Sequence, residues 1–340
     1  MNNRVHGLDT IRFVCALWVF LGHTGGPFPN PDNIVEKLVR SFFMGAINAP
    51  AAVIIFFLIS GFCIHYPFRA NRPIELTSFY SRRLIRILLP VFAMLLLSYP
   101  IGYRIPEGGI QNTVLWSIFA EITYYIIYPV VLLPLRRRVG WRPIVIASFL
   151  IGFVLASTKP EAINYIDLGL AWTWLLGLPC WLLGCVLAER SDSLTAETRQ
   201  RISIWLWRLS VLVVSAVTSL MLWHPLFGLR VGFPWTLNLF GIYAYFWLSQ
   251  EIIHFRKHKP NALLEAGGIW SYSLYLMHVP AIIFFKSLTF LHRGLSSELL
   301  WLLEVILTLV VSYVFFKIAE QPSQALASFV GKKLSPKATG

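Results

Sequence analysis

Two residues of the first apolar segment have side chains that could carry out chemistry. Arg12 is a cation and His23 an imidazole, and ten residues separate them. Eleven steps of ~100° return to nearly the same face of a helix, and they place the two side chains roughly 16 Å apart along its axis. A neutral imidazole can take a proton from a hydroxyl, which acyl transfer to an alcohol requires. The alternative is a histidine that lies at the outer membrane interface.

Glu121 is another charged residue inside an apolar segment. Ser117, Glu121 and Tyr125 recur every four residues and therefore share one helix face, while Trp116 is typical of a membrane interface. A buried carboxylate needs a partner or a proton. Glu121 could therefore orient His23, bind a sugar hydroxyl or pair with an arginine. The alternative is a structural carboxyl that ties helices together.

A basic cluster opens a further apolar segment and contains Arg82, Arg83 and Arg86. Arg83 and Arg86 are three residues apart and share a helix face. With Arg12 at the same level of the membrane, they could form a basic well for a phosphorylated cytoplasmic molecule. The alternative is a run of charge that only sets the membrane topology.

Further polar residues accompany these. His278 shares a face with Tyr275, which indicates either a wet cavity or a hydrogen-bonded helix pair. Ser60 precedes Gly61, which permits close approach of a ligand or of another helix. Glu320 could pair with the basic cluster. We expect the following residues to support the substrate or the structure: Asp9, Ser60, Trp116, Ser117, Tyr125, Tyr272, Tyr275, His278 and Glu320.

The composition predicts that the elements that position these residues cross a membrane. The 340 residues are 56% hydrophobic and 13% charged, with a mean hydropathy of +0.65, whereas soluble domains carry about 25% charged residues. Apolar runs long enough to span a bilayer recur along the chain. We predict an all-α polytopic bundle of about ten transmembrane helices, at residues 10–26, 44–66, 87–103, 114–135, 143–158, 169–188, 204–223, 234–252, 268–290 and 298–318.

Most of the 29 Lys and Arg residues fall on the side that would be cytoplasmic if the N-terminus lies inside. This asymmetry follows the positive-inside rule and predicts that both termini are cytoplasmic. It also explains the net charge of +13 through contacts with anionic lipid headgroups, without nucleic acid. We expect one transmembrane domain over residues 1–320 and a frayed cytoplasmic tail over 321–340. The four cysteines lack metal-ligand spacing, so we expect packing residues and no metal.

Six motifs in this order resemble the transmembrane acyltransferase-3 family, the membrane O-acyltransferases of bacterial surface glycans. The resemblance covers nearly the whole chain. It includes Arg12 and His23 with the residues just before Arg12, and it continues through FFLISGF at 56–62, RRLIRILLP at 82–90, WSIFAEITYY at 116–125, SYSLYLMHVP at 271–280 and EQP at 320–322.

The resemblance implies roles for the matching residues. His23 matches the family's catalytic histidine and Glu121 its helix-four glutamate, so both are expected to be catalytic. Arg12 matches the arginine linked with acyl-CoA. Arg83 and Arg86 match the basic pair on the third transmembrane helix of the family. The residues expected to bind the donor are Arg12, Arg82, Arg83 and Arg86.

The resemblance also implies an activity and a location. A ten-helix core in the bacterial cytoplasmic (inner) membrane would move an acyl group, usually acetyl from acetyl-CoA, to a hydroxyl of a surface glycan or lipid-linked oligosaccharide. Some relatives carry an additional esterase-like domain outside the membrane. Since that domain is missing here, we expect direct transfer or a separate periplasmic partner. The sequence does not show whether the acyl group is acetyl, succinyl or a longer chain, or which sugar accepts it. It also leaves open whether an acyl-enzyme forms and what the oligomeric state is.

A secondary transporter or flippase for a glycan or small anion is the main alternative, because buried His, Glu and Arg residues also mark proton and substrate paths. Such a transporter is expected to show repeat symmetry with broken helices in corresponding halves, and the sequence shows no such repeat. A membrane scaffold would leave the buried charges unexplained.

Overall fold

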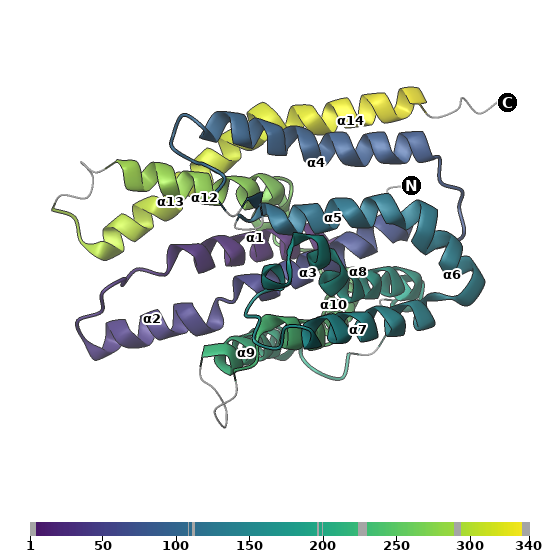
Figure 1. The fold of residues 1–340 in the computed structure, drawn as a ribbon, viewed down its shortest axis with the longest axis horizontal. Coiled ribbons are helices and arrows are strands. Elements are labelled where there is room, and N and C mark those ends of the chain that lie inside the picture. Colours follow the sequence, from purple (N-terminus) through teal and green to yellow (C-terminus); the bar gives the residue numbers. More distant parts are fainter. Residues whose placement is uncertain are drawn as a thin grey trace.

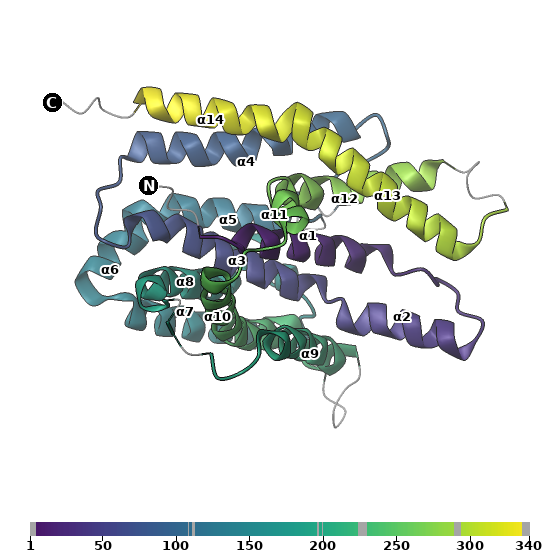
Figure 2. The ribbon, with the colours of Figure 1, turned by 180° about the vertical axis from the view of Figure 1, so that it is seen from behind.

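The computed structural model describes residues 5–107, 109–110, 113–195, 197–198, 200–223, 230–288 and 294–334. Helices make up 80% of the structure and the described residues contain no strand, which confirms the all-α class. Most of the long helices follow one common direction (Figures 1 and 2). At one end α6 (Leu133–Val139) turns into α7 (Trp141–Ser157); α14 (Gln321–Leu334) runs toward this end and α1 (Leu8–Thr24) runs away from it.

The centre of the bundle is the pair α3 (Ala49–His65) and α8 (Leu170–Arg190), with α1 beside α3. Two glycines explain how closely α3 and α8 approach. A Cβ at Gly61 would lie 1.9 Å from the Trp181 carbonyl oxygen, and one at Gly184 would lie 2.0 Å from the Leu58 carbonyl oxygen. Small residues at such contacts let helix backbones meet within a membrane bundle.

The glycine at the α3–α8 contact gives a test of this packing. We expect Gly184→Ala to lower stability by about 1–3 kcal/mol or more, because the added methyl group must push two helix backbones apart. Gly45→Ala is the control, since a Cβ there meets no atom within 4 Å. The measurement is thermal unfolding in detergent, followed by tryptophan fluorescence. Equal unfolding temperatures for the two variants would contradict this account of the contact.

Other helices surround this centre. Helix α5 packs against α8, α12 against α1, and α10 against both α3 and α8. Helix α7 covers the far side of α8, α9 packs on α10 and α2, and α13 packs on α12. The bounds of these helices are α2 Ile34–Ala46, α5 Leu115–Ile127, α9 Ile204–Trp223, α10 Phe233–Lys257, α12 Ser271–Ser287 and α13 Ser297–Phe315.

The expectation of a frayed tail is wrong for residues 321–334. They form α14, which lies alongside α4 (Leu76–Ser98) at one edge of the molecule (Figures 1 and 2). Ser323 donates to the Ile85 carbonyl at 2.8 Å, and Ser78 donates to the Gly331 carbonyl at 2.8 Å. Small residues on one face of α14 permit this contact, and a single sequence does not reveal its partner. Residues 335–340 of the predicted tail lie outside the described residues.

A short helix holds the beginning of α1. Helix α11 (Ala262–Gly268) meets α12 at an angle of 72° and packs on α1. Its Glu265 accepts hydrogen bonds from the backbone N–H of Thr10 at 3.0 Å, from the Thr10 hydroxyl at 2.7 Å and from the N–H of Gly7 at 3.3 Å. Glu265 thereby satisfies free N–H groups at the first turn of α1, where a negative charge also favours the helix dipole.

Each of the ten predicted segments coincides with a helix, with shifts of the bounds that are largest at α4. Five helical stretches of the described chain are long and apolar enough to cross a membrane: Ile34–Phe68, Leu115–Val139, Leu170–Ser193, Ile204–Trp223 and Ser297–Leu334. The bent pair of α11 and α12 would make a sixth. The protein is therefore a multi-pass membrane protein. Ten crossings and the cytoplasmic side of the termini stay predictions.

Candidate active site

A cavity of about 150 Å³ opens between α1, α3, α4, α5 and α12. We call it the arginine cavity, because Arg12, Arg83 and Arg86 line it together. Glu121 and Glu320 are the acidic residues of its lining. The sequence placed the three arginines on two separate helices at one level, and the structure brings them to one space.

Contacts with neighbours orient Arg12. Its Nη1 donates to Asp9 Oδ1 at 3.0 Å, one helical turn away, and its Nη2 donates to the Cys63 sulfur at 3.1 Å. The sequence analysis treated Cys63 only as a packing residue. It lines the arginine cavity and is half-buried, whereas Cys15, Cys180 and Cys185 are buried.

Arg82 is not among the residues that line this cavity, so its part in donor binding stays a prediction. Its side chain lies against Gly331 of α14. Arg82 lies one helical turn before Arg86 on nearly the same face of α4, and it contacts α14 instead of the cavity.

Glu121 is held in the arginine cavity by hydroxyl groups. Its Oε1 accepts hydrogen bonds from Ser60 at 2.7 Å and from Tyr125 at 2.5 Å, and Trp181 Nε1 donates to the Ser60 oxygen at 3.2 Å. Of the three roles predicted for Glu121, orienting His23 is not met, because His23 lines a different cavity.

His23 lines a second and larger cavity, of about 570 Å³, which we call the histidine cavity. Trp116 and Tyr103 also line it, along with apolar residues of α1, α10 and α12. Arg104 is its cation, and the Arg104 guanidinium donates to the Tyr103 carbonyl at 3.0 Å and lies over the Tyr99 ring. The predicted interface residue Trp116 is thus a wall of the space that His23 faces.

The hydrogen bonds of His23 and His278 define which ring nitrogens are free. His23 Nδ1 lies 2.8 Å from the Val19 carbonyl oxygen, and His278 Nδ1 lies 2.7 Å from the Tyr275 carbonyl oxygen. A carbonyl oxygen only accepts, so both Nδ1 atoms carry hydrogen, and in the neutral form of each ring Nε2 is the nitrogen without hydrogen. The two rings are 4.9 Å apart, and the fully buried His278 Nε2 has no hydrogen-bond partner. The structure brings these two predicted site histidines together.

Two residues line both cavities: Val53 of α3 and Tyr275 of α12. The Tyr275 hydroxyl donates to the Val114 carbonyl at 3.0 Å and lies 2.6 Å from the Ser117 oxygen. The arginine and histidine cavities therefore meet at a shared wall, with Arg12, Arg83 and Arg86 on one side and His23 and Arg104 on the other.

The remaining predicted residues have supporting contacts. Tyr272 lines the arginine cavity and donates to the Ile87 carbonyl at 3.0 Å, which ties α12 to α4. Glu320 accepts from the backbone N–H of Ser273 at 3.0 Å and from its hydroxyl at 2.5 Å. It lies in a π-helical turn, Phe316–Glu320, between α13 and α14; such turns are frequent at functional sites.

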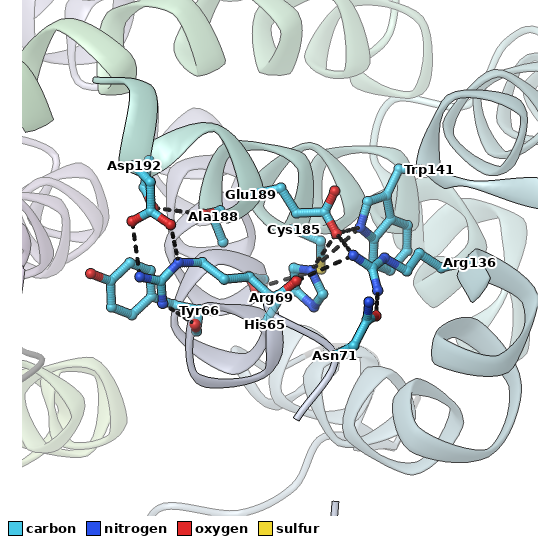
Figure 3. Close-up of polar contacts among 12 residues, drawn as sticks. His65, Tyr66, Arg69, Asn71, Arg136, Trp141, Cys185, Ala188, Glu189 and Asp192 are labelled. Atoms are coloured by element: carbon cyan, nitrogen blue, oxygen red, sulfur yellow. Dashed lines mark hydrogen bonds and ion pairs between the residues drawn. The ribbon is translucent and has the colours of Figure 1, made fainter. Parts of the chain in front are cut away.

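A buried polar cluster that the sequence did not reveal lies beside the α6–α7 turn (Figure 3). His65 lies 2.8 Å from the Tyr128 hydroxyl through Nδ1 and 3.0 Å from Glu189 through Nε2. Glu189 also accepts from Trp141 at 3.0 Å and pairs with Arg136. These contacts join α3, α6, α7 and α8. The sequence does offer one signal for this cluster, which is the histidine His65 inside the predicted apolar span 44–66.

The comparison with known families comes to the same conclusion as the motifs. The sequence model described as "Acyltransferase domain", the acyltransferase-3 model, matches residues 5–317. The chain belongs to the acyltransferase-3 family. Together with the membrane-spanning helices, this membership makes the protein a membrane acyltransferase. The matched region contains every residue of both cavities except Glu320.

A similar protein is known from an animal. The chain is 23% identical to "Regulator of hypoxia-inducible factor 1" of Caenorhabditis elegans over an alignment 434 residues long. The match covers 98% of this chain and 82% of that protein. No solved structure matches the chain.

Proposed function

We propose that this acyltransferase moves an acetyl group from cytoplasmic acetyl-CoA to a hydroxyl of a surface or lipid-linked glycan, in the bacterial cytoplasmic membrane. The observation that carries the proposal is the pair of cavities that meet at Val53 and Tyr275. One cavity gathers Arg12, Arg83 and Arg86 for an anionic donor, and the other, which Arg104 also lines, offers the imidazole of His23 to an acceptor hydroxyl. This arrangement suits a donor and an acceptor that enter separately and meet between the cavities.

The arginine cavity would hold the thin end of the donor. A space of 150 Å³ is about the size that holds one benzene molecule, so it would accept only the thioester end of the pantetheine arm and not the nucleotide. The anionic nucleotide would lie outside, where Arg86 is exposed at the mouth. Arginine suits phosphate because its fork of N–H donors matches phosphate oxygens.

His23 would act as the general base. Its Nε2 takes the proton of the acceptor hydroxyl as the oxygen attacks the thioester carbon. The tetrahedral intermediate then loses the CoA thiolate, which takes up the proton from His23, so that the products are the acetyl ester and CoA thiol. The Nδ1–H bond to the Val19 carbonyl holds the ring with Nε2 free for this step.

Glu121 would serve the donor rather than the base. It lies in the same cavity as Arg12 and Arg83, and its hydrogen bonds fix Ser60 and Tyr125 in the cavity wall. We therefore assign Glu121 to positioning the donor end and balancing the charge of the arginines. This role replaces the catalytic partnership with His23 that the sequence favoured.

The direct test uses purified protein in lipid nanodiscs with radiolabelled acetyl-CoA and a lipopolysaccharide or exopolysaccharide acceptor. Labelled acetyl on the glycan, released by mild base as an ester, supports the proposal. In parallel, mass spectrometry compares the surface glycans of cells with and without the protein. Movement of unmodified glycan without label transfer would support the transporter instead.

Cys63 provides a probe of the donor site that does not depend on the acceptor. A small thiol reagent such as methyl methanethiosulfonate is expected to label Cys63 before the three buried cysteines, because only Cys63 of the four lines the arginine cavity. Saturating acetyl-CoA is expected to slow this labelling at least about 10-fold, since ligand occupancy protects in proportion to saturation. Mass spectrometry of peptides measures it, and Cys63→Ser is the control. Unchanged labelling under saturation would place the donor elsewhere.

A further inference from the structure

We propose that Val53 and Tyr275 determine the length of the acyl group that the enzyme transfers. The inference rests on the proposed function, because it concerns how the thioester end of the donor meets the acceptor. Val53 and Tyr275 are the two residues common to the linings of the arginine and histidine cavities. The acyl group would have to lie against them when it meets the acceptor oxygen.

Tyr275 is a fixed part of this wall. Its hydroxyl is held by the Val114 carbonyl and by Ser117. Its ring packs edge-on against Phe56, with ring centres 5.9 Å apart, and lies 5.9 Å from His278 on the side toward His23. The residue is 7% exposed. A ring fixed at both its hydroxyl and its faces is not free to swing aside for a long acyl chain.

Val53 closes the wall from α3. It is 6% exposed, and its β-branched side chain has little rotamer freedom in a helix. On one side of it along α3, Phe56 and Phe57 line the arginine cavity, and on the other side Ala49 and Pro50 line the histidine cavity. Val53 therefore lies where α3 passes from one cavity to the other.

The sizes of the cavities make this wall selective. The arginine cavity has about 150 Å³ for the whole donor end, and the histidine cavity has about 570 Å³ beyond the wall. A two-carbon acyl group can reach the wall with its carbonyl, whereas each further methylene must displace Val53 or Tyr275. One methylene in a closely fitting pocket changes kcat/KM by roughly 10- to 200-fold. The geometry thus favours acetyl over longer acyl groups.

The test measures kcat/KM for acetyl-, propionyl- and butyryl-CoA with the same glycan acceptor. The ratio of acetyl-CoA to butyryl-CoA is expected to exceed about 10 in the unmodified protein. It is expected to fall at least about 10-fold in Val53→Ala and further in Tyr275→Ala, because each opens the wall. Tyr275→Phe keeps the ring and is expected to keep the ratio. Val279→Ala widens only the histidine cavity, whose lining contains Val279, and is also expected to keep the ratio.

The outcomes separate the two proposals. No transfer from any acyl-CoA by the unmodified protein would overturn the proposed function itself. Transfer by the unmodified protein with equal use of butyryl- and acetyl-CoA would overturn only the role of the wall. An unchanged ratio in folded Val53→Ala would do the same, and this smaller substitution decides the matter even if Tyr275→Ala does not fold.

Discussion

His23→Ala is expected to lower kcat for glycan acetylation by roughly 10²- to 10⁴-fold, the range that a positioned general base contributes. His23 lines the histidine cavity with its Nδ1 bound to the Val19 carbonyl, and no other imidazole lines this space among the residues that the structure describes. Donor binding is expected to persist, because His23 does not line the arginine cavity. Initial rates with labelled acetyl-CoA measure the first effect, and protection of Cys63 from thiol reagent measures the second.

A matched histidine serves as the control. His258 is exposed at the end of α10 and lines neither cavity, so His258→Ala is expected to leave transfer unchanged. Loss of Cys63 protection in His23→Ala would mean that the two cavities do not divide the roles as assigned. Transfer at the unmodified rate by folded His23→Ala would remove His23 from the chemical step.

The second large effect is expected on the KM for acetyl-CoA, at one of two neighbouring arginines on α4. Arg83→Ala is expected to raise the KM for acetyl-CoA by roughly 10- to 100-fold, since a hydrogen bond to a charged group contributes about 1.5–3 kcal/mol. Arg82→Ala is expected to change it less than about 2-fold, because Arg82 lies against Gly331 of α14, outside the cavity. Both variants remove the same charge from adjacent positions, so a general electrostatic effect on the anionic donor would affect them equally.

The measurement is the dependence of the initial rate on acetyl-CoA concentration at fixed acceptor. Equal increases in KM for Arg82→Ala and Arg83→Ala would indicate a diffuse attraction by the basic surface and not a direct contact between Arg83 and the donor. An effect confined to Arg82→Ala would place the donor on the α4–α14 face.

The sequence predicted well those features that depend on one helix at a time. The spacing of Arg83 and Arg86 put both on one face, and the level of Arg12 in the membrane matched theirs; all three line one cavity. The four-residue repeat of Ser117, Glu121 and Tyr125 likewise identified a face that points inward. Helix periodicity determines which residues share a face. The free-energy cost of exposing polar side chains to lipid determines which face turns inward.

Features that depend on how helices pack could not be derived in this way. Glu121 and His23 line different cavities, because the position of a residue along its own helix does not show which neighbouring helix its side chain faces. The cap that Glu265 provides for α1 joins residues 255 positions apart. The predicted frayed tail instead forms helix α14, which docks on α4 and contacts Arg82.

The central claim is that donor and acceptor reach one reaction centre from two cavities. Proteoliposomes with uniformly oriented protein test it most directly, with labelled acetyl-CoA on the face next to the arginine cavity and glycan acceptor only on the other face. The account predicts acetylated glycan on the acceptor face, dependent on His23. Acetylation that occurs only when both substrates share one face, or glycan that crosses unmodified, would contradict it.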